Sequence, residues 1–207
     1  SPRLTVAHDE DGNIRAAQKG MNGAFTDAEV REAVKTARKY ANQKYGKGKN
    51  EIEAFADAFH GRTMMAIALN GSKRMTDGFG PMPKSIKHHE FNKIDGLGSK
   101  FSSNTSAVIL ELVQGEAGII PAKKKFVSAI VKLCKKNNAL LIIDEVQSGV
   151  GITGQMWCHQ SFTPKNCQCT CEDASTAPDV IAFGKKTQVC GIFASKRLDE
   201  VDDHVFH

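Results

Sequence analysis

Asp144 is the first residue whose type and position suggest chemistry, because it ends the most apolar run of the chain. It follows "LLII" and precedes "EVQSGVG", a stretch with two glycines. A buried carboxylate there needs a cationic or hydrogen-bonding partner, since burying it unpaired is costly. The ordinary alternative is a helix N-cap, a position that aspartate favours. Taken alone, the residue leaves both interpretations open, with the cap ahead.

Lys185 follows a second apolar segment, in "DVIAFGKKTQ". A lysine at the carboxyl edge of a sheet becomes a nucleophile when desolvation or nearby cations lower its pKa, and it then forms imines with aldehydes. The alternative is that Lys185 and Lys186 are solvated surface lysines.

Two further segments combine polar groups with turns. "FHGRT" (59–63) holds an aromatic, a glycine and an arginine that could stack on a ring and bind an anion. It could equally be an ordinary turn with a core Phe59, in which His60 makes a local hydrogen bond. In "ELVQGEAG" (111–118), Glu111 and Glu116 flank the exit from a strand. Glutamates in such places are usually solvated.

The elements that must position these residues follow from the hydrophobic pattern. Helices are expected from Thr26 or Asp27 to about Tyr45, over 62–69 and around 126–134. Strands are expected at the start of 51–59 and at 107–112, 139–143, 179–183 and 189–195, with an irregular excursion over 71–106. This alternation predicts an α/β fold, a mostly parallel sheet with helices on both faces. Ligands of such sheets bind beyond the carboxyl ends of the strands.

Composition excludes several classes of function. The 207 residues carry a dispersed net charge of +5, without the basic stripe and interleaved aromatics that nucleic-acid binding needs. No apolar run reaches the roughly 18 residues of a membrane span. The start of the chain lacks a signal-peptide pattern, so we expect a cytoplasmic location, or an organelle matrix.

The cysteines do not predict a metal site. Three of the six lie in "NCQCTC", within a polar segment (163–176) inserted between two elements. Cys-x-Cys-x-Cys is not the spacing of a zinc site, and a chain of this size does not need disulfides. We expect no bound metal.

In this order, the segments resemble the class III, fold-type I pyridoxal-phosphate aminotransferases. That family includes lysine 6-, acetylornithine, ornithine and 4-aminobutyrate aminotransferases. The resemblance runs from about Lys35 to Phe206. It rests on "KTARKYA", "FHGRT", "QGEAG", "LLIIDEVQSGVGITG" and "APDVIAFGKK".

The resemblance implies a role for each cofactor residue. Asp144 would pair with the pyridine nitrogen of pyridoxal 5'-phosphate and keep it protonated. Val146 and Phe59 would pack on the two faces of the ring, and Gln147 would lie near its phenolic oxygen. Lys185 would bind the cofactor as an imine and then move a proton between substrate and cofactor.

The resemblance also implies the surroundings of the cofactor. His60 belongs to the same cofactor-binding set, and Glu111 would support the loop. Gly23 and Ala24 are what remains of the phosphate-binding loop. Arg62 and Glu116 would contact the substrate, because a planar guanidinium suits a carboxylate.

The implied reaction is transfer of a terminal amino group from an omega-amino acid donor to 2-oxoglutarate. Lysine is the first choice of donor, followed by acetylornithine or ornithine and 4-aminobutyrate. Residues 1–20 are unassigned. Residues 21–207 would form an incomplete large domain with the insertion at 163–176 and no C-terminal small domain, and the full-length protein would be a homodimer. The alternative is a truncated or degenerate domain without catalysis that serves as a binding or interaction module.

Overall fold

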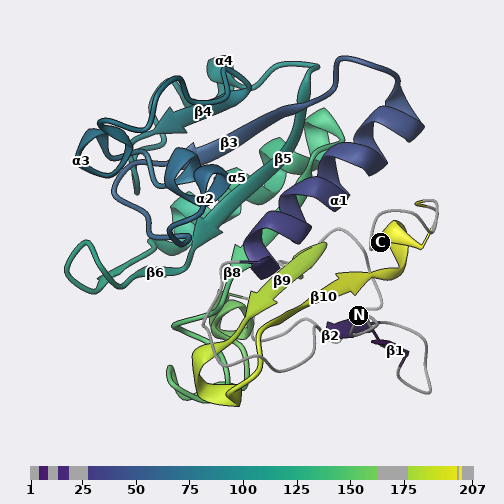
Figure 1. The fold of residues 1–207 in the computed structure, drawn as a ribbon, viewed down its shortest axis with the longest axis vertical. Coiled ribbons are helices and arrows are strands. Elements are labelled where there is room, and N and C mark those ends of the chain that lie inside the picture. Colours follow the sequence, from purple (N-terminus) through teal and green to yellow (C-terminus); the bar gives the residue numbers. More distant parts are fainter. Residues whose placement is uncertain (1–4, 9–13, 19–27, 163–176, 200, 202–207) are drawn as a thin grey trace.

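The computed structural model describes residues 5–8, 14–18, 28–162, 177–199 and 201. Its centre is an eight-stranded sheet of order β1-β2-β10-β9-β8-β5-β3-β4 (Figure 1). The parallel part consists of β4 (Ile86–His89), β3 (Glu51–Phe55), β5 (Thr105–Glu111), β8 (Leu140–Asp144) and β9 (Val180–Phe183). The predicted fold class, a mostly parallel α/β sheet, is confirmed.

Antiparallel strands extend the sheet on one side. They are β10 (Gly191–Ser195), β2 (Ile14–Gln18) and β1 (Thr5–His8). The predicted strand at 189–195 is therefore present but runs against β9. A separate two-stranded ribbon, β6 (Val113–Gln114) with β7 (Ile120–Pro121), follows β5.

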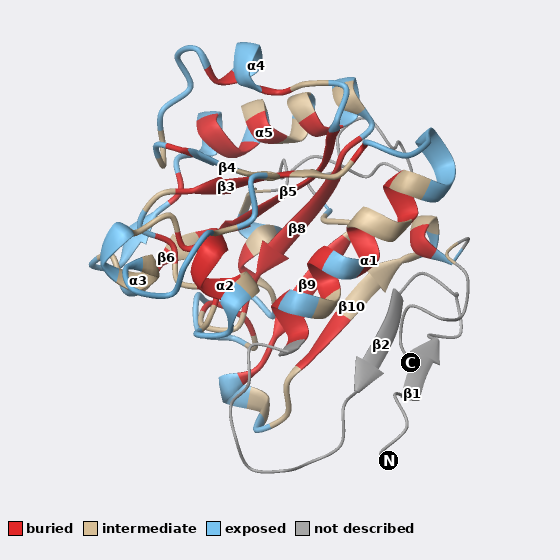
Figure 2. Ribbon diagram, turned by 45° about the horizontal axis from the view of Figure 1, so that its top comes forward, coloured by how far each residue is buried: buried red, intermediate tan, exposed pale blue. Residues whose placement is uncertain are grey.

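One long helix covers each face of the sheet, so that the central strands are buried on both sides (Figure 2). α1 (Ala28–Tyr45) packs Val34 and Ala37 against Ile109 and Ile142. α5 (Lys124–Asn137) places its apolar side, including Phe126 and Ile130, in a second cluster with Leu110 and Ile143. Strand residues thus alternate between two cores, which explains why β5 and β8 are continuous apolar runs.

Shorter helices complete the described residues. α2 (Met64–Leu69), α3 (Lys73–Thr76) and α4 (Leu97–Lys100) lie between β3 and β5 in the chain, and the 3-10 helices are η1 (Cys158–Phe162), η2 (Lys185–Thr187) and η3 (Lys196–Leu198). The predicted helices ending near Tyr45 and over 62–69 and 126–134 are confirmed. The expected caps Thr26 and Asp27 lie outside the described residues.

The prediction of an irregular excursion over 71–106 is wrong. That segment contains β4, which pairs in parallel with β3, as well as α3 and α4. β4 reads "IKHH", and only His89 in it is buried. A four-residue edge strand with one buried residue shows too little hydrophobic periodicity to be recognised. Residues 1–20 also contribute two strands where none was assigned.

Across the ranges described above, no helix combines the length and apolar character needed to cross a membrane.

Candidate active site

A pocket lies at the carboxyl edge of the parallel strands, where the predicted functional segments meet. Its lining comes from the first turn of α1, the loop after β3, the end of β8 and the chain after β9. The lining residues are Glu29, Val30, Phe59, His60, Gly61, Asp144, Val146, Gln147, Lys185 and Cys190. This is where ligands bind in open α/β sheets.

Asp144, the last residue of β8, is 5% exposed and has two partners. Its Oδ1 accepts the Val146 N–H at 3.0 Å, which forms a tight turn, and its Oδ2 lies 2.8 Å from His60 Nδ1. No helix begins there in the described part of the chain, so the N-cap interpretation is wrong. The buried carboxylate has the cationic partner that its burial requires.

His60 does not make the local hydrogen bond expected of it, because its ring contacts Asp144, 84 residues away. Its backbone N–H donates to Asn70 Oδ1 at 2.6 Å, and Asn70 Nδ2 donates to the Gly61 carbonyl, so Asn70 binds the loop after β3 at two points. Burial alone would lower the His60 pKa. The hydrogen bond to Asp144 and the charges of Asp144 and Glu111 outweigh burial, so this pKa is raised.

An imidazolium–carboxylate pair is therefore favoured at the base of the pocket. His60 is 2% exposed, and its second ring nitrogen, Nε2, has no hydrogen-bond partner within the described ranges.

Glu111 ends β5 and is buried beside the same pair. Its Oε2 accepts the Phe59 N–H at 2.9 Å, and its Cα is the register partner of Asp144 in the neighbouring strand. Burial raises the pKa of Glu111 to about 7, although the charge of His60 opposes that rise. The contact with Phe59 agrees with the expectation that Glu111 supports this loop. The expectation that such glutamates are solvated is wrong for Glu111 and correct for the exposed Glu116.

Lys185 begins η2 directly after β9, as the sequence predicted, and lines the pocket. Its backbone φ is 42°, in the left-handed region, where a non-glycine residue carries about 1–3 kcal/mol of strain. Gly184 lets the chain approach this point, because a Cβ there would lie 2.8 Å from Cys190 Sγ. Lys185 and Lys186 are both exposed, as expected of surface lysines, but Lys185 lines the pocket and Lys186 does not.

The remaining predicted cofactor residues lie around the pair. Phe59 and Val146 present half-buried apolar groups to the pocket. The amide of Gln147 fits where Gly115 has no side chain, and its Nε2 is buried without a hydrogen-bond partner in the described part of the chain. Gly23 and Ala24 lie outside the described residues.

Arg62 and Glu116 lie beside the pocket rather than in it. Both are exposed and line an open groove that shares Phe59 with the pocket. The Arg62 guanidinium carbon lies 5.9 Å from the centroid of the Phe59 ring, a cation–π arrangement. The groove therefore offers groups of both charges next to the pocket mouth.

Sequence reasoning missed Glu29, Val30 and Cys190. Glu29 and Val30 lie in the first turn of α1, which starts at the carboxyl edge of the sheet. An acidic residue in the first turn of the predicted helix was the available signal for them. Nothing in the sequence marked Cys190, which faces the pocket because β10 turns back beside β9. Burial, and then the charge of Glu29, raise the pKa of its thiol.

Known proteins resemble this chain in sequence and in fold. It is 44% identical over 158 residues to the succinylornithine transaminase of Photorhabdus laumondii and 40% identical over 158 residues to the acetylornithine aminotransferase of Pseudomonas putida. Each match covers 72% of this chain and 39% of the relative, so the chain spans about two-fifths of the length of these relatives.

Solved structures share the fold. The lysine aminotransferase of M. tuberculosis superimposes with a TM-score of 0.71 at 28% identity, over 99% of this chain and 46% of that enzyme. The ornithine aminotransferase of Toxoplasma gondii ME49 gives a TM-score of 0.75 at 20% identity, over 99% of this chain and 51% of that one, which shows the fold alone.

The family profile described as aminotransferase class-III matches residues 23–202, which is most of the chain. This match agrees with the parallel sheet, with Asp144 at the end of β8 and with Lys185 after β9. The chain therefore belongs to the class-III aminotransferases, whose cofactor is pyridoxal phosphate.

Proposed function

We propose that the protein containing this chain transfers the terminal amino group of an omega-amino acid to 2-oxoglutarate. One observation carries the proposal. A buried carboxylate–imidazolium pair, a lysine on a strained turn and a buried amide nitrogen, Gln147 Nε2, that has no partner among the described residues share one pocket at the carboxyl edge of the sheet.

The described residues fit pyridoxal phosphate. Asp144 has acceptor capacity left after its two hydrogen bonds and would hold a proton on the ring nitrogen. Phe59 and Val146 would cover the ring, and the Gln147 amide nitrogen, which has no acceptor within the described ranges, would donate to an oxygen of the cofactor. When bound, the cofactor supplies an electron sink for the substrate carbon.

Two parts of this chain would do the remaining work. The first turn of α1 lines the pocket, and the unpaired N–H groups of a helix N-terminus favour a phosphate. The Lys185 amine would bind the aldehyde carbon and then carry a proton to and from the reacting carbon of the substrate, as a general base and acid.

Arg62 and Glu116 support an amino-acid donor. An arginine binds a carboxylate in a planar, two-pronged geometry, and a glutamate attracts an ammonium group. Both charges are available in the groove beside the pocket. A second copy of the full-length protein would complete the site as a homodimer.

The identity of the donor rests on the comparisons. The relatives at 44% and 40% identity are named for succinylornithine and acetylornithine, which favours an N-acylornithine. Lysine, the first choice from the sequence motifs, is supported by the M. tuberculosis enzyme, at 28% identity over nearly the whole chain. Both donors present a terminal amino group, so the proposed reaction class is the same.

Reconstitution tests the proposal. We expect the purified protein, mixed with pyridoxal phosphate, to develop a visible absorbance band that borohydride removes, leaving a pyridoxyl group on Lys185 detectable by mass spectrometry. Lys185→Ala should abolish the adduct, and Lys186→Ala is the matched control that should retain it. A folded protein that shows no band and no adduct would support the non-catalytic alternative instead.

A donor screen then separates the substrates. Full-length protein is mixed with 2-oxoglutarate and each of succinylornithine, acetylornithine, ornithine, lysine and 4-aminobutyrate, and glutamate formation is measured. The proposal expects an acylornithine or lysine to be the fastest donor. Alanine, which has an alpha-amino group and no terminal one, is included as the control donor. Activity with alanine and none of the five terminal-amino donors would contradict the proposal.

A further inference from the structure

Two buried carboxylates, on neighbouring strand ends, lie close to one imidazole of the pocket lining. Glu111 and Asp144 are register partners at the ends of β5 and β8, and they are 3% and 5% exposed. Asp144 contacts the His60 ring directly, whereas Glu111 contacts the backbone of the preceding residue, Phe59. The charges of both carboxylates act on His60.

The Glu111 side chain therefore has two separable actions. Its hydrogen bond to the Phe59 N–H fixes the loop that carries both the stacking ring and His60. Its charge is the second negative charge facing an imidazole whose Nε2 lacks a partner in the described ranges. Glu111 is not itself among the residues that line the pocket, and its side chain contacts the pocket lining through the Phe59 backbone.

Charge balance shows what the second carboxylate does. With Asp144 alone ionised, one negative charge would face two positive charges, the His60 imidazolium and a protonated ring nitrogen. With Glu111 ionised as well, two negative charges face two positive ones. Charges of opposite sign within a few ångströms favour each other's ionised forms, so the second carboxylate favours both protons.

We propose that Glu111 is a positioning residue that controls the protonation of the His60–Asp144 pair and thereby how firmly Asp144 holds a proton on the cofactor ring. The effect on the cofactor ring proton rests on the proposed function. The effect on the protonation of His60 depends on the residues of this chain alone.

Other titratable groups surround the pair. His88 of β4 interacts electrostatically with His60, and Glu29 of α1, Lys185 of η2 and Cys190 line the same pocket. Glu111 differs from these because it is buried on the same strand edge as Asp144. Burial raises its pKa to about 7, so its charge changes near neutral pH.

The test is an NMR titration of the histidine rings in the cofactor-free protein, with the His60 signal assigned by its loss in His60→Gln. Glu111→Gln keeps the acceptor for the Phe59 N–H but removes the charge. We expect the His60 midpoint to fall by about one pH unit. Glu111→Asp retains the charge and should leave the midpoint closer to that of the wild type than Glu111→Gln does.

A matched control and a second readout keep the result interpretable. Glu53→Gln changes another buried carboxylate paired with a histidine, and it should not move the His60 midpoint. In wild-type protein, the His60 signal should show a second inflection near pH 7, where Glu111 titrates. This readout needs no variant, so a variant that fails to fold does not end the test.

In cofactor-loaded protein, Glu111→Gln should also shift the pH at which the visible band changes, to lower pH. A folded Glu111→Gln with an unmoved His60 midpoint overturns the inference, as does a wild-type His60 curve without the second inflection. A protein that binds no pyridoxal phosphate contradicts the proposed function, but the histidine titration still decides the role of Glu111.

Discussion

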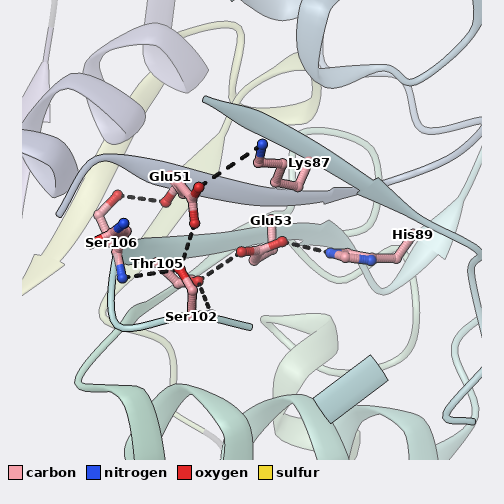
Figure 3. Close-up of polar contacts among 8 residues, drawn as sticks. Glu51, Glu53, Lys87, His89, Ser102, Thr105 and Ser106 are labelled. Carbon is pink, nitrogen blue, oxygen red and sulfur yellow. Dashed lines mark hydrogen bonds and ion pairs between the residues drawn. The ribbon is translucent and has the colours of Figure 1, made fainter. Parts of the chain in front are cut away.

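Two buried carboxylate–imidazole pairs lie on the parallel sheet, and they differ in what surrounds them. His60 Nδ1 lies 2.8 Å from Asp144. His89 Nε2 lies 2.6 Å from Glu53, and Figure 3 shows this second pair. In each pair the carboxylate and the ring are buried, and each ring keeps one nitrogen without a partner in the described part of the chain. Pairing and burial alone therefore do not distinguish them.

The surroundings do distinguish them. Glu53 lies within β3, and its second oxygen accepts the Thr105 hydroxyl of β5 at 2.7 Å. The His89 ring stacks on Phe101, with centroids 6.1 Å apart, and packs near Phe55 in the core under α5. This pair joins β3, β4 and β5 and opens on no pocket lining described above. A buried pair becomes a candidate for chemistry when it lies at the strand ends beside a pocket and a lysine.

The largest expected difference between the His60–Asp144 and His89–Glu53 pairs is their effect on catalytic activity. Asp144→Asn should lower transamination by the full-length protein about 100-fold or more, because it removes the charge that holds the ring proton. Glu53→Gln should leave the activity of the folded protein within about threefold, since the hydrogen bonds of Glu53 in the described part of the chain go to His89 of β4 and Thr105 of β5, away from the pocket lining. Steady-state rates with the best donor measure both. Equal losses in the two variants would remove the distinction between the pairs.

Stability tests the structural role of the Glu53–His89 pair. Glu53→Ala should lower the free energy of unfolding by about 3–5 kcal/mol, because it leaves His89 and Thr105 buried without their partner. Urea unfolding followed by circular dichroism measures this change. Glu51→Ala is the control on the same strand. Glu51 is partly exposed, its contact with Lys87 is 3.9 Å long, and its Oε2 accepts the Ser102 hydroxyl at 2.6 Å, so we expect a loss of at most about 2 kcal/mol. A Glu53→Ala loss no larger than that of the control would contradict a structural role.

The pH dependence of stability sharpens the comparison further. Burial raises the pKa of Glu111 to about 7 in the folded chain, well above the usual value of a glutamate, so its contribution to stability is present at low pH and lost as the pH rises through 7. The loss between pH 5 and pH 8 should be about 3 kcal/mol. Glu111→Gln should flatten this part of the profile. An unchanged slope in that variant would show that Glu111 does not titrate in this range.

The smallest expected effect concerns the turn before Lys185. Gly184→Ala would bring a Cβ within 2.8 Å of Cys190 Sγ, so a stability loss of about 1–2 kcal/mol is expected, together with weaker binding of pyridoxal phosphate. Gly154→Ala tests glycine replacement away from the pocket, where the Cβ meets no atom within 4 Å but the φ of 86° is strained. Fluorescence titration with the cofactor separates the two, because only Gly184→Ala should weaken binding.

Much of the fold could be predicted because its signals are local. Apolar runs marked β5, β8 and β9, and periodic apolar residues marked α1 and α5. β4 was missed because its exposed edge carries polar side chains. The His60–Asp144 contact was missed for a different reason. No sequence pattern around a histidine indicates a hydrogen-bond partner 84 residues away. Glu29 and Cys190 were missed because only the packing of α1 and β10 brings them to the pocket.

The sequence by itself determined that Asp144 ends one apolar strand and that Lys185 follows another, because hydrophobic runs and the polar residues that stop them are properties of short segments. Tertiary structure alone decided that these ends meet in one pocket. Strand order and register place Glu111 beside Asp144, and the loop held by Asn70 brings His60 to the same carboxylate. Such contacts depend on long-range packing, in which a shift of one residue in a strand would turn its side chains to the opposite face.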